Sequence, residues 1–154
     1  MKSIILVLPY PISANRYWRP VKLAKHITIV PTKEAKQYKS DVRGLVLAAG
    51  VAAPLTGRVQ IDVRLYPGRP LDWQARMRKL GAAWDDSVRS IDLDNANKVL
   101  MDALKGVVIV DDNWQVRRIY SERMEPDEHG ARLVVRVLAL EVEQPQLELA
   151  GVEF

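Results

Sequence analysis

Residues 91–106 read IDLDNANKVLMDALKG, and they carry the clearest helix signal in this chain of 154 residues. The apolar side chains recur at helical spacing, at Ala96, Val99, Leu100, Ala103 and Leu104. The opposite side is polar and carries Asp94, Lys98, Asp102 and Lys105. Gly106 closes the pattern, as glycine often does after the last turn of a helix. The sequence therefore predicts an amphipathic helix over residues 94–105 that packs one side on a core.

Strand patterns lie on both sides of this helix. Residues 4–8 form a short apolar run, and residues 58–66 alternate apolar and polar side chains, which is typical of a half-buried strand. Two final strands are expected at 119–124 and 132–140, joined by the turn-rich segment 126–130. A short apolar run at 107–110 follows Gly106.

A second helix is expected at the start of the chain, after the first strand. Thr32 is placed to cap a helix that runs to about Ala49, while Pro9, Pro11 and Pro20 indicate an irregular segment before it. The expected fold class is α+β, a small mixed sheet with helices packed on one side. The expected order is strand-helix-strand-helix-strand-strand, with one inserted helical segment.

The inserted segment is residues 67–90, a long connection for a compact domain. Trp73, Met77, Leu80 and Trp84 recur at helical spacing after Asp72, a possible N-cap, so a short amphipathic helix is expected. The two tryptophans either bury against the protein or stack on unpaired bases.

Length and composition limit the class of protein. The length suits one domain, expected at residues 1–140, with an acidic C-terminal tail at 141–154. The chain has no cysteine and two histidines, which excludes thiolate sites and disfavours a histidine-rich zinc site. A metal site would need oxygen ligands, which favour Mg²⁺, Mn²⁺ or Ca²⁺. Residues 4–8 are too short for a signal peptide or a membrane span, so we expect a cytoplasmic protein with no membrane partner.

The charge is unevenly distributed along the chain. Residues 1–50 hold nine Lys and Arg against two Asp and Glu, whereas residues 126–154 hold two against six. A polyanion would be attracted to the first half of the chain. The predicted DNA-binding residues are those that flank Tyr17 and Trp18, namely Arg16, Arg19, Lys22 and Lys25. The alternative is an ordered, solvated surface loop.

Acidic residues gather at two places around the helix. Asp92 and Asp94 precede or begin it, and Asp111 and Asp112 follow the run after it. If the chain returns position 112 to the start of the helix, three carboxylates would form a site for a hard metal ion. Such a site can activate water and stabilise the leaving oxygen in phosphodiester hydrolysis. Lys98, one turn after Asp94, could offset charge on the phosphate.

Each of these residues also has an ordinary structural interpretation. Asp94 could be only a helix N-cap, Lys98 only a surface partner of Asp94 or Asp102, and residues 111–113 only a turn. Asp102 could orient Lys98 or form a plain surface ion pair. His26 could donate to a phosphate, or be exposed or bonded to the backbone.

The order of these residues resembles the RusA family of Holliday-junction resolvases. The similar features are Asp92-Leu93-Asp94-Asn95, Lys98, Asp102-Ala103-Leu104 and Asp111-Asp112. The opening Leu8-Pro9-Tyr10-Pro11, with Ser13 and Asn15 to Arg19, is similar to the Pro-rich start of that family. The resemblance covers about residues 4–138.

The resemblance implies a homodimeric, Mg²⁺-dependent endodeoxyribonuclease, with Mn²⁺ as a possible substitute. The implied activity is resolution of four-way DNA junctions by paired symmetric nicks in recombination and repair. Asp92, Asp94 and Asp112 would be catalytic metal ligands, with Lys98 assisting. The sequence departs from the family pattern in residues 67–90, which are longer than expected.

Two other functions are weighed against the nuclease. One is a non-catalytic DNA-binding protein in which the acidic cluster is structural. The other is a metal-dependent sugar-nucleotide transferase, because those enzymes also use two aspartates two residues apart. The chain is short for such an enzyme and has no glycine-rich phosphate loop.

Overall fold

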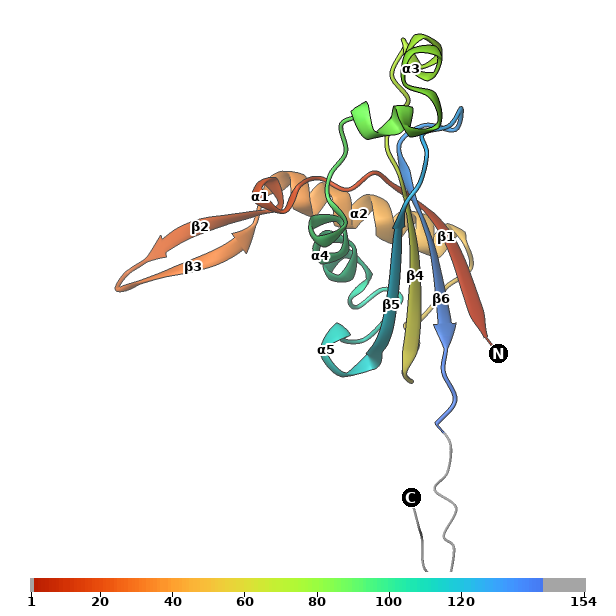
Figure 1. Ribbon diagram of the computed structural model, residues 1–154. Coiled ribbons are helices and arrows are strands. Elements are labelled where there is room, and N and C mark those ends of the chain that lie inside the picture. The colour runs from red at the N-terminus through yellow and green to blue at the C-terminus, as the bar shows by residue number, and fades with distance from the viewer. Residues whose placement is uncertain (1, 143–154) are drawn as a thin grey trace, which may run out of the picture.

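The computed structural model describes residues 2–142, and Figure 1 shows its elements in chain order. The strands are β1 (Ser3–Pro9), β2 (Trp18–Leu23), β3 (His26–Pro31), β4 (Val59–Tyr66), β5 (Val116–Arg123) and β6 (Arg132–Ala139). The α-helices are α1 (Ala14–Tyr17), α2 (Lys33–Ala48), α3 (Trp73–Leu80), α4 (Leu93–Leu104) and α5 (Asp112–Gln115). A 3₁₀ helix, η1 (Gly81–Ser87), follows α3.

The main sheet has four strands in the order β1-β6-β4-β5. β6 is antiparallel to both of its neighbours, while β4 and β5 are parallel, so the sheet is mixed. The predicted α+β class with a mixed sheet is confirmed. The predicted strands at 58–66 and 132–140 are β4 and β6, and Thr32 does cap α2 by accepting from the Ala35 amide.

α2 and α4 pack on one face of the sheet, whereas α3 lies beyond the ends of the strands (Figure 1). The side chains of β4 that face α2 and α4 are fully buried, namely Val59, Ile61, Val63 and Leu65. The apolar side of α4 is buried in the same core, through Ala96, Val99, Leu100, Ala103 and Leu104. Truncating one of these leucines to alanine would cost about 2–5 kcal/mol. This burial fixes α4 on the sheet and presents its polar side outward.

The segment after Pro9 differs from the prediction, because it is not irregular. It forms the short helix α1 and then an antiparallel hairpin of β2 and β3, separate from the main sheet. Two features of the sequence conceal the hairpin. Pro20 lies inside β2, which is tolerated because both strands of a two-stranded ribbon are edges. The turn has Ala24 at a φ of 45° where glycine or asparagine is usual.

The predicted helix in residues 67–90 is confirmed as α3, but its apolar stripe does not continue to Trp84. Gly81 ends the helix at a φ of 70°, and Trp84 lies on η1. Trp84 is buried and donates its indole N–H to Glu125. It is therefore unavailable to stack on bases, whereas Trp73 is partly exposed under the Arg69 guanidinium. Asp72 does not cap α3 through its side chain and instead accepts from Arg76.

The chain after α4 also differs from expectation. Residues 107–110 form no named strand, since they make a tight turn in which Ile109 forms two isolated bridges, one to Leu55 and one to Lys105. Gly106, at a φ of 78°, starts this turn. Residues 107–112 therefore stay near the C-terminal end of α4, and only β5, which follows them, runs back along the helix to place Ser121 beside Asn97. Of the predicted tail at 141–154, all but Glu141 and Val142 lies outside the described residues.

Candidate active site

The polar side of α4 lines a groove of about 380 Å³. The α4 residues that line it, with Lys105 just after the helix, are Asp94, Asn97, Lys98, Met101, Asp102 and Lys105. These positions recur every three or four residues, so they form one stripe along the helix. Trp18 at the base of the hairpin and Asp112 at the start of α5 complete the lining. The groove therefore combines residues that the sequence places far apart.

Asp92 lies outside this groove lining and is the N-cap of α4. Its side chain accepts the Asn95 amide at 2.9 Å. The side chains of Asp92 and Asp94 would point the same way only in an extended backbone, but the helix begins at Leu93, so Asp94 lies in its first turn. Residues two apart on a helix do not face each other. Asp92, and not Asp94, therefore has the capping role.

Asp94 and Lys98 form an exposed ion pair one turn apart, with 3.2 Å between the carboxylate and the ammonium. Both side chains are more than half exposed, so the pair alone stabilises the helix by only a few tenths of a kcal/mol. Lys98 is paired with Asp94 and not with Asp102. Its ammonium is therefore held by a weak contact beside a solvent-filled groove.

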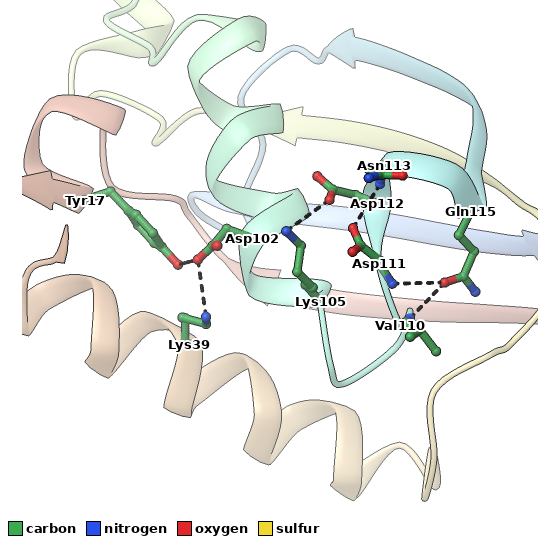
Figure 2. A network of polar contacts seen from close by, with 9 residues as sticks. All are labelled: Tyr17, Lys39, Asp102, Lys105, Val110, Asp111, Asp112, Asn113 and Gln115. Atoms are coloured by element: carbon green, nitrogen blue, oxygen red, sulfur yellow. Dashed lines mark hydrogen bonds and ion pairs between the residues drawn. The ribbon is translucent and has the colours of Figure 1, made fainter. Parts of the chain in front are cut away.

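Asp112 pairs with Lys105 at the other end of α4, at 3.1 Å (Figure 2). Their hydrogen bond raises the pKa of the Lys105 ammonium. From Asp94 to Lys105 the helix rises about 16 Å, at about 1.5 Å per residue. Asp112 thus shares a groove with Asp94 without lying beside it, contrary to the expected return to the helix start. The tight turn after Gly106 is the physical reason.

Asp111 and Gln115 fix the segment that carries Asp112. Asp111 caps α5 by accepting the Asn113 amide at 3.1 Å, and this bond lowers the pKa of Asp111. Gln115 is fully buried, and its carbonyl oxygen accepts the amides of Val110 and Asp111 (Figure 2). Its amide group donates to the Leu55 carbonyl. Nothing in the local sequence pattern distinguishes Gln115 from a surface residue, so its burial is not predictable from the sequence.

Asp102 joins three elements at the middle of the groove. It accepts a short hydrogen bond from the Tyr17 hydroxyl of α1 and lies 3.4 Å from the Lys39 ammonium of α2 (Figure 2). Burial of Tyr17 and its bond to Asp102 raise the pKa of that hydroxyl well above its usual range. Asp102 therefore anchors the hairpin base to α4, and its contacts differ from the suggested role of orienting Lys98.

The groove offers carboxylate oxygens, the type of ligand that a hard cation prefers. Within residues 2–142, no three His, Asp or Glu side chains come close enough together to hold a metal ion. However, two of the predicted carboxylates, Asp94 and Asp112, each hold a lysine ammonium in a solvated groove. A divalent cation takes oxygen ligands. It could therefore replace the lysine ammonium beside either carboxylate.

The predicted DNA-binding residues lie at and along the hairpin. Arg19 and Lys22 are exposed on β2, and Lys25 is exposed in its turn. Arg16 precedes them on α1, where it pairs with Glu34 at 2.6 Å. His26 begins β3 and is exposed. These basic side chains are exposed, but the segment that carries them is a hairpin and not a loop.

Comparison with known proteins identifies the family. The family model described as "Endodeoxyribonuclease RusA" matches residues 9–138. No curated protein sequence matches the chain. The matched range runs from the end of β1 to β6 and includes the hairpin, α4 and Asp112. Because this range covers most of the chain, the protein belongs to the RusA family of endodeoxyribonucleases.

Proposed function

We propose that this protein is a divalent-metal-dependent, structure-selective endonuclease that resolves four-way DNA junctions by paired symmetric nicks. The observation that carries the proposal is the groove on α4, where carboxylates and lysines alternate in an endodeoxyribonuclease chain. The proposed catalytic residues are Asp92, Asp94, Lys98 and Asp112, with the three aspartates as metal ligands. Mg²⁺ is the proposed cation and Mn²⁺ its substitute.

A divalent cation held by carboxylates of this groove would supply positive charge against the scissile phosphate. The remaining work falls to residues of the chain. Lys98 and Lys105 hold the carboxylates at 3.2 and 3.1 Å, and both ammoniums can turn to phosphate oxygens once the carboxylates are otherwise neutralised. Asp102, bonded to Tyr17 and Lys39, keeps the groove wall in place. Cationic groups there stabilise the charge that develops as the bond breaks.

The direct test compares a synthetic four-way junction with a linear duplex of the same sequence. With Mg²⁺ or Mn²⁺ we expect two symmetric nicks in the junction and none in the duplex. With EDTA we expect binding without cleavage. Binding without cleavage in Mg²⁺ would instead favour the alternative, a non-catalytic DNA-binding protein whose acidic residues serve structure.

We expect DNA affinity to depend mainly on the basic residues at the start of the chain. Replacing Arg16, Arg19, Lys22 and Lys25 together by alanine should weaken binding and flatten its salt dependence, because fewer counterions are released. The slope of log affinity against log salt should fall by about 0.9 for each phosphate that the variant no longer neutralises. Arg16 should contribute least, since Glu34 already neutralises it. Filter binding at several salt concentrations measures the slope.

The matched control removes exposed basic residues elsewhere, through alanine at Lys33, Lys36 and Arg43 of α2. That variant should bind with nearly the wild-type slope. An unchanged slope in the first variant would move the DNA surface away from the hairpin and direct attention to the arginines of residues 67–90.

We also propose a homodimer, because two symmetric nicks need two active sites related by a two-fold axis. Trp114 of α5 is about half exposed, and the sheet face opposite α2 and α4 exposes Ile5, Val7 and Tyr120. Sedimentation equilibrium at micromolar concentration should give twice the chain mass. A monomer with full activity would contradict the proposal.

A pair of double variants tests whether the sheet face forms the dimer contact. Replacing Ile5 and Val7 by aspartate should disrupt the dimer, whereas replacing the exposed Leu45 and Leu47 of α2 by aspartate should not.

The proposed function also implies a domain organisation, a cellular compartment and a process. We propose one nuclease domain at residues 1–140, acting in the cytoplasm during DNA recombination and repair. Among residues 2–142, the helices are all too short or too polar to cross a membrane.

A further inference from the structure

The hairpin of β2 and β3 projects away from the body of the protein (Figure 1). It is a separate two-stranded sheet that joins the domain at α1 and the start of α2. A two-stranded hairpin is at best marginally stable alone in water. Because the hairpin projects from the domain, its faces are accessible to a partner.

The strand register sorts the hairpin side chains onto two faces. Directly opposed residues share a face, and every second residue does so along a strand. One face carries Trp18, Pro20 and Lys22 of β2 with Ile27, Ile29 and Pro31 of β3. Ile27 is 70 % exposed and Ile29 is 69 % exposed. This face, which we call the wedge face, is apolar and open to solvent.

The charge of the hairpin favours a polyanion over a second copy of the chain. Residues 18–31 contain Arg19, Lys22 and Lys25 and no Asp or Glu. Lys22 lies directly opposite Ile27 on the wedge face itself. Two such faces packed together would bury like charges without partners. Against DNA, the same cations can pair with phosphates while the isoleucines contact bases.

The wedge face begins at the groove, because Trp18 lines both. Pro31 pairs with Trp18 at the base of the hairpin, and Ile27 lies four residues from Pro31 toward the turn. At about 3.3 Å per residue, the face extends about 13 Å from the groove. That length corresponds to about four base steps at about 3.4 Å each. A phosphate in the groove would thus place the isoleucines within a few base pairs of the cut.

We propose that the wedge face inserts against unstacked bases at the branch point of the junction. Isoleucine and proline are among the side chains that proteins insert between base steps. Unstacking is least costly where pairing is already disturbed, as it is at a branch point. The wedge face therefore selects branched over linear DNA, while the lysines supply affinity for either. This inference rests on the proposed function.

The experiment uses junctions with 2-aminopurine at the branch point, bound in EDTA so that no strand is cut. The fluorescence of 2-aminopurine rises when the base unstacks, and we expect a rise with the wild-type protein. In the double variant Ile27→Thr/Ile29→Thr the rise should disappear, and junction affinity should fall about tenfold because less apolar area is buried against the bases. Affinity for linear duplex should not change. Threonine is β-branched and keeps the strand propensity of these positions.

Two further variants distinguish a less apolar wedge face from a damaged hairpin. Leu23→Thr changes a side chain that is 49 % exposed on the opposite face, and it should keep the fluorescence rise. Ile27→Val/Ile29→Val removes only one methylene from each residue and should keep most of it. An equal loss of the rise in the Leu23 variant would overturn the inference.

The remaining outcomes are also decisive. If the wild-type protein cuts junctions but leaves 2-aminopurine stacked, the inference is wrong and the proposed function stands. The inference is equally wrong if the double-threonine variant becomes monomeric while the wild-type protein is dimeric, since the wedge face would then be a subunit contact. If the wild-type protein neither binds nor cuts junctions, the proposed function fails and the inference fails with it.

Discussion

Asp92→Asn, Asp94→Asn and Asp112→Asn should each abolish junction cleavage while leaving junction binding largely intact. Asparagine keeps the shape of the side chain but removes the negative charge that binds a divalent cation. We expect affinity for DNA to come mainly from the hairpin lysines and arginines, which these variants leave unchanged. Single-turnover cleavage in Mg²⁺, beside junction binding in EDTA, measures both properties.

The structure makes the Asp92 variant the most informative of the three. Asparagine caps helices about as well as aspartate, so Asp92→Asn should keep the bond to the Asn95 amide and the stability of α4. A loss of cleavage without a change in the thermal melt would therefore assign chemistry to Asp92 despite its position outside the groove lining.

Asp111→Asn provides the neighbouring control for Asp112. Asp111 caps α5 and is not part of the groove lining, and asparagine can also accept the Asn113 amide. This variant should cut junctions at close to the wild-type rate. Wild-type rates and wild-type metal dependence in all three catalytic variants would show that the site assignment is wrong.

Lys98→Ala is expected to lower the cleavage rate by about 10²-fold or more, the scale of a lost electrostatic donor. Junction and metal affinity should change little. Lys98 lies in the groove and its only ion pair among residues 2–142 is the exposed one with Asp94, so its ammonium can reach a bound phosphate at little cost. Lys98→Arg should recover only part of the rate, because a planar guanidinium places its charge differently from an ammonium.

The competing interpretation of Lys98 predicts a different result. If the residue only pairs with Asp94, Lys98→Ala should leave cleavage nearly unchanged and cost a few tenths of a kcal/mol in the free energy of unfolding. Single-turnover cleavage and a thermal melt of the same variant separate the two. A normal rate would leave the aspartates as the only proposed catalytic residues.

The sequence alone determined the elements whose patterns are local. The apolar side of α4, the alternation in β4 and the Thr32 cap of α2 depend on the spacing of a few neighbouring residues. The polar stripe of α4 follows from the same spacing, which by itself places Asp94, Lys98, Asp102 and Lys105 on one side of the helix. The order of the acidic residues also indicated the family correctly.

The hairpin and the position of Asp112 were decided by tertiary structure. β2 and β3 carry a proline and an alanine turn, which are poor strand and turn signals, so their pairing is visible only in the folded chain. Asp112 meets Lys105 because a tight turn, and not a strand, follows Gly106. Tertiary structure also decided the burial of Gln115 and the hydrogen bond between Tyr17 and Asp102, which joins residues 85 positions apart. Spacing along the chain determines which side chains share a face, but only the packing of the chain on itself determines which faces meet.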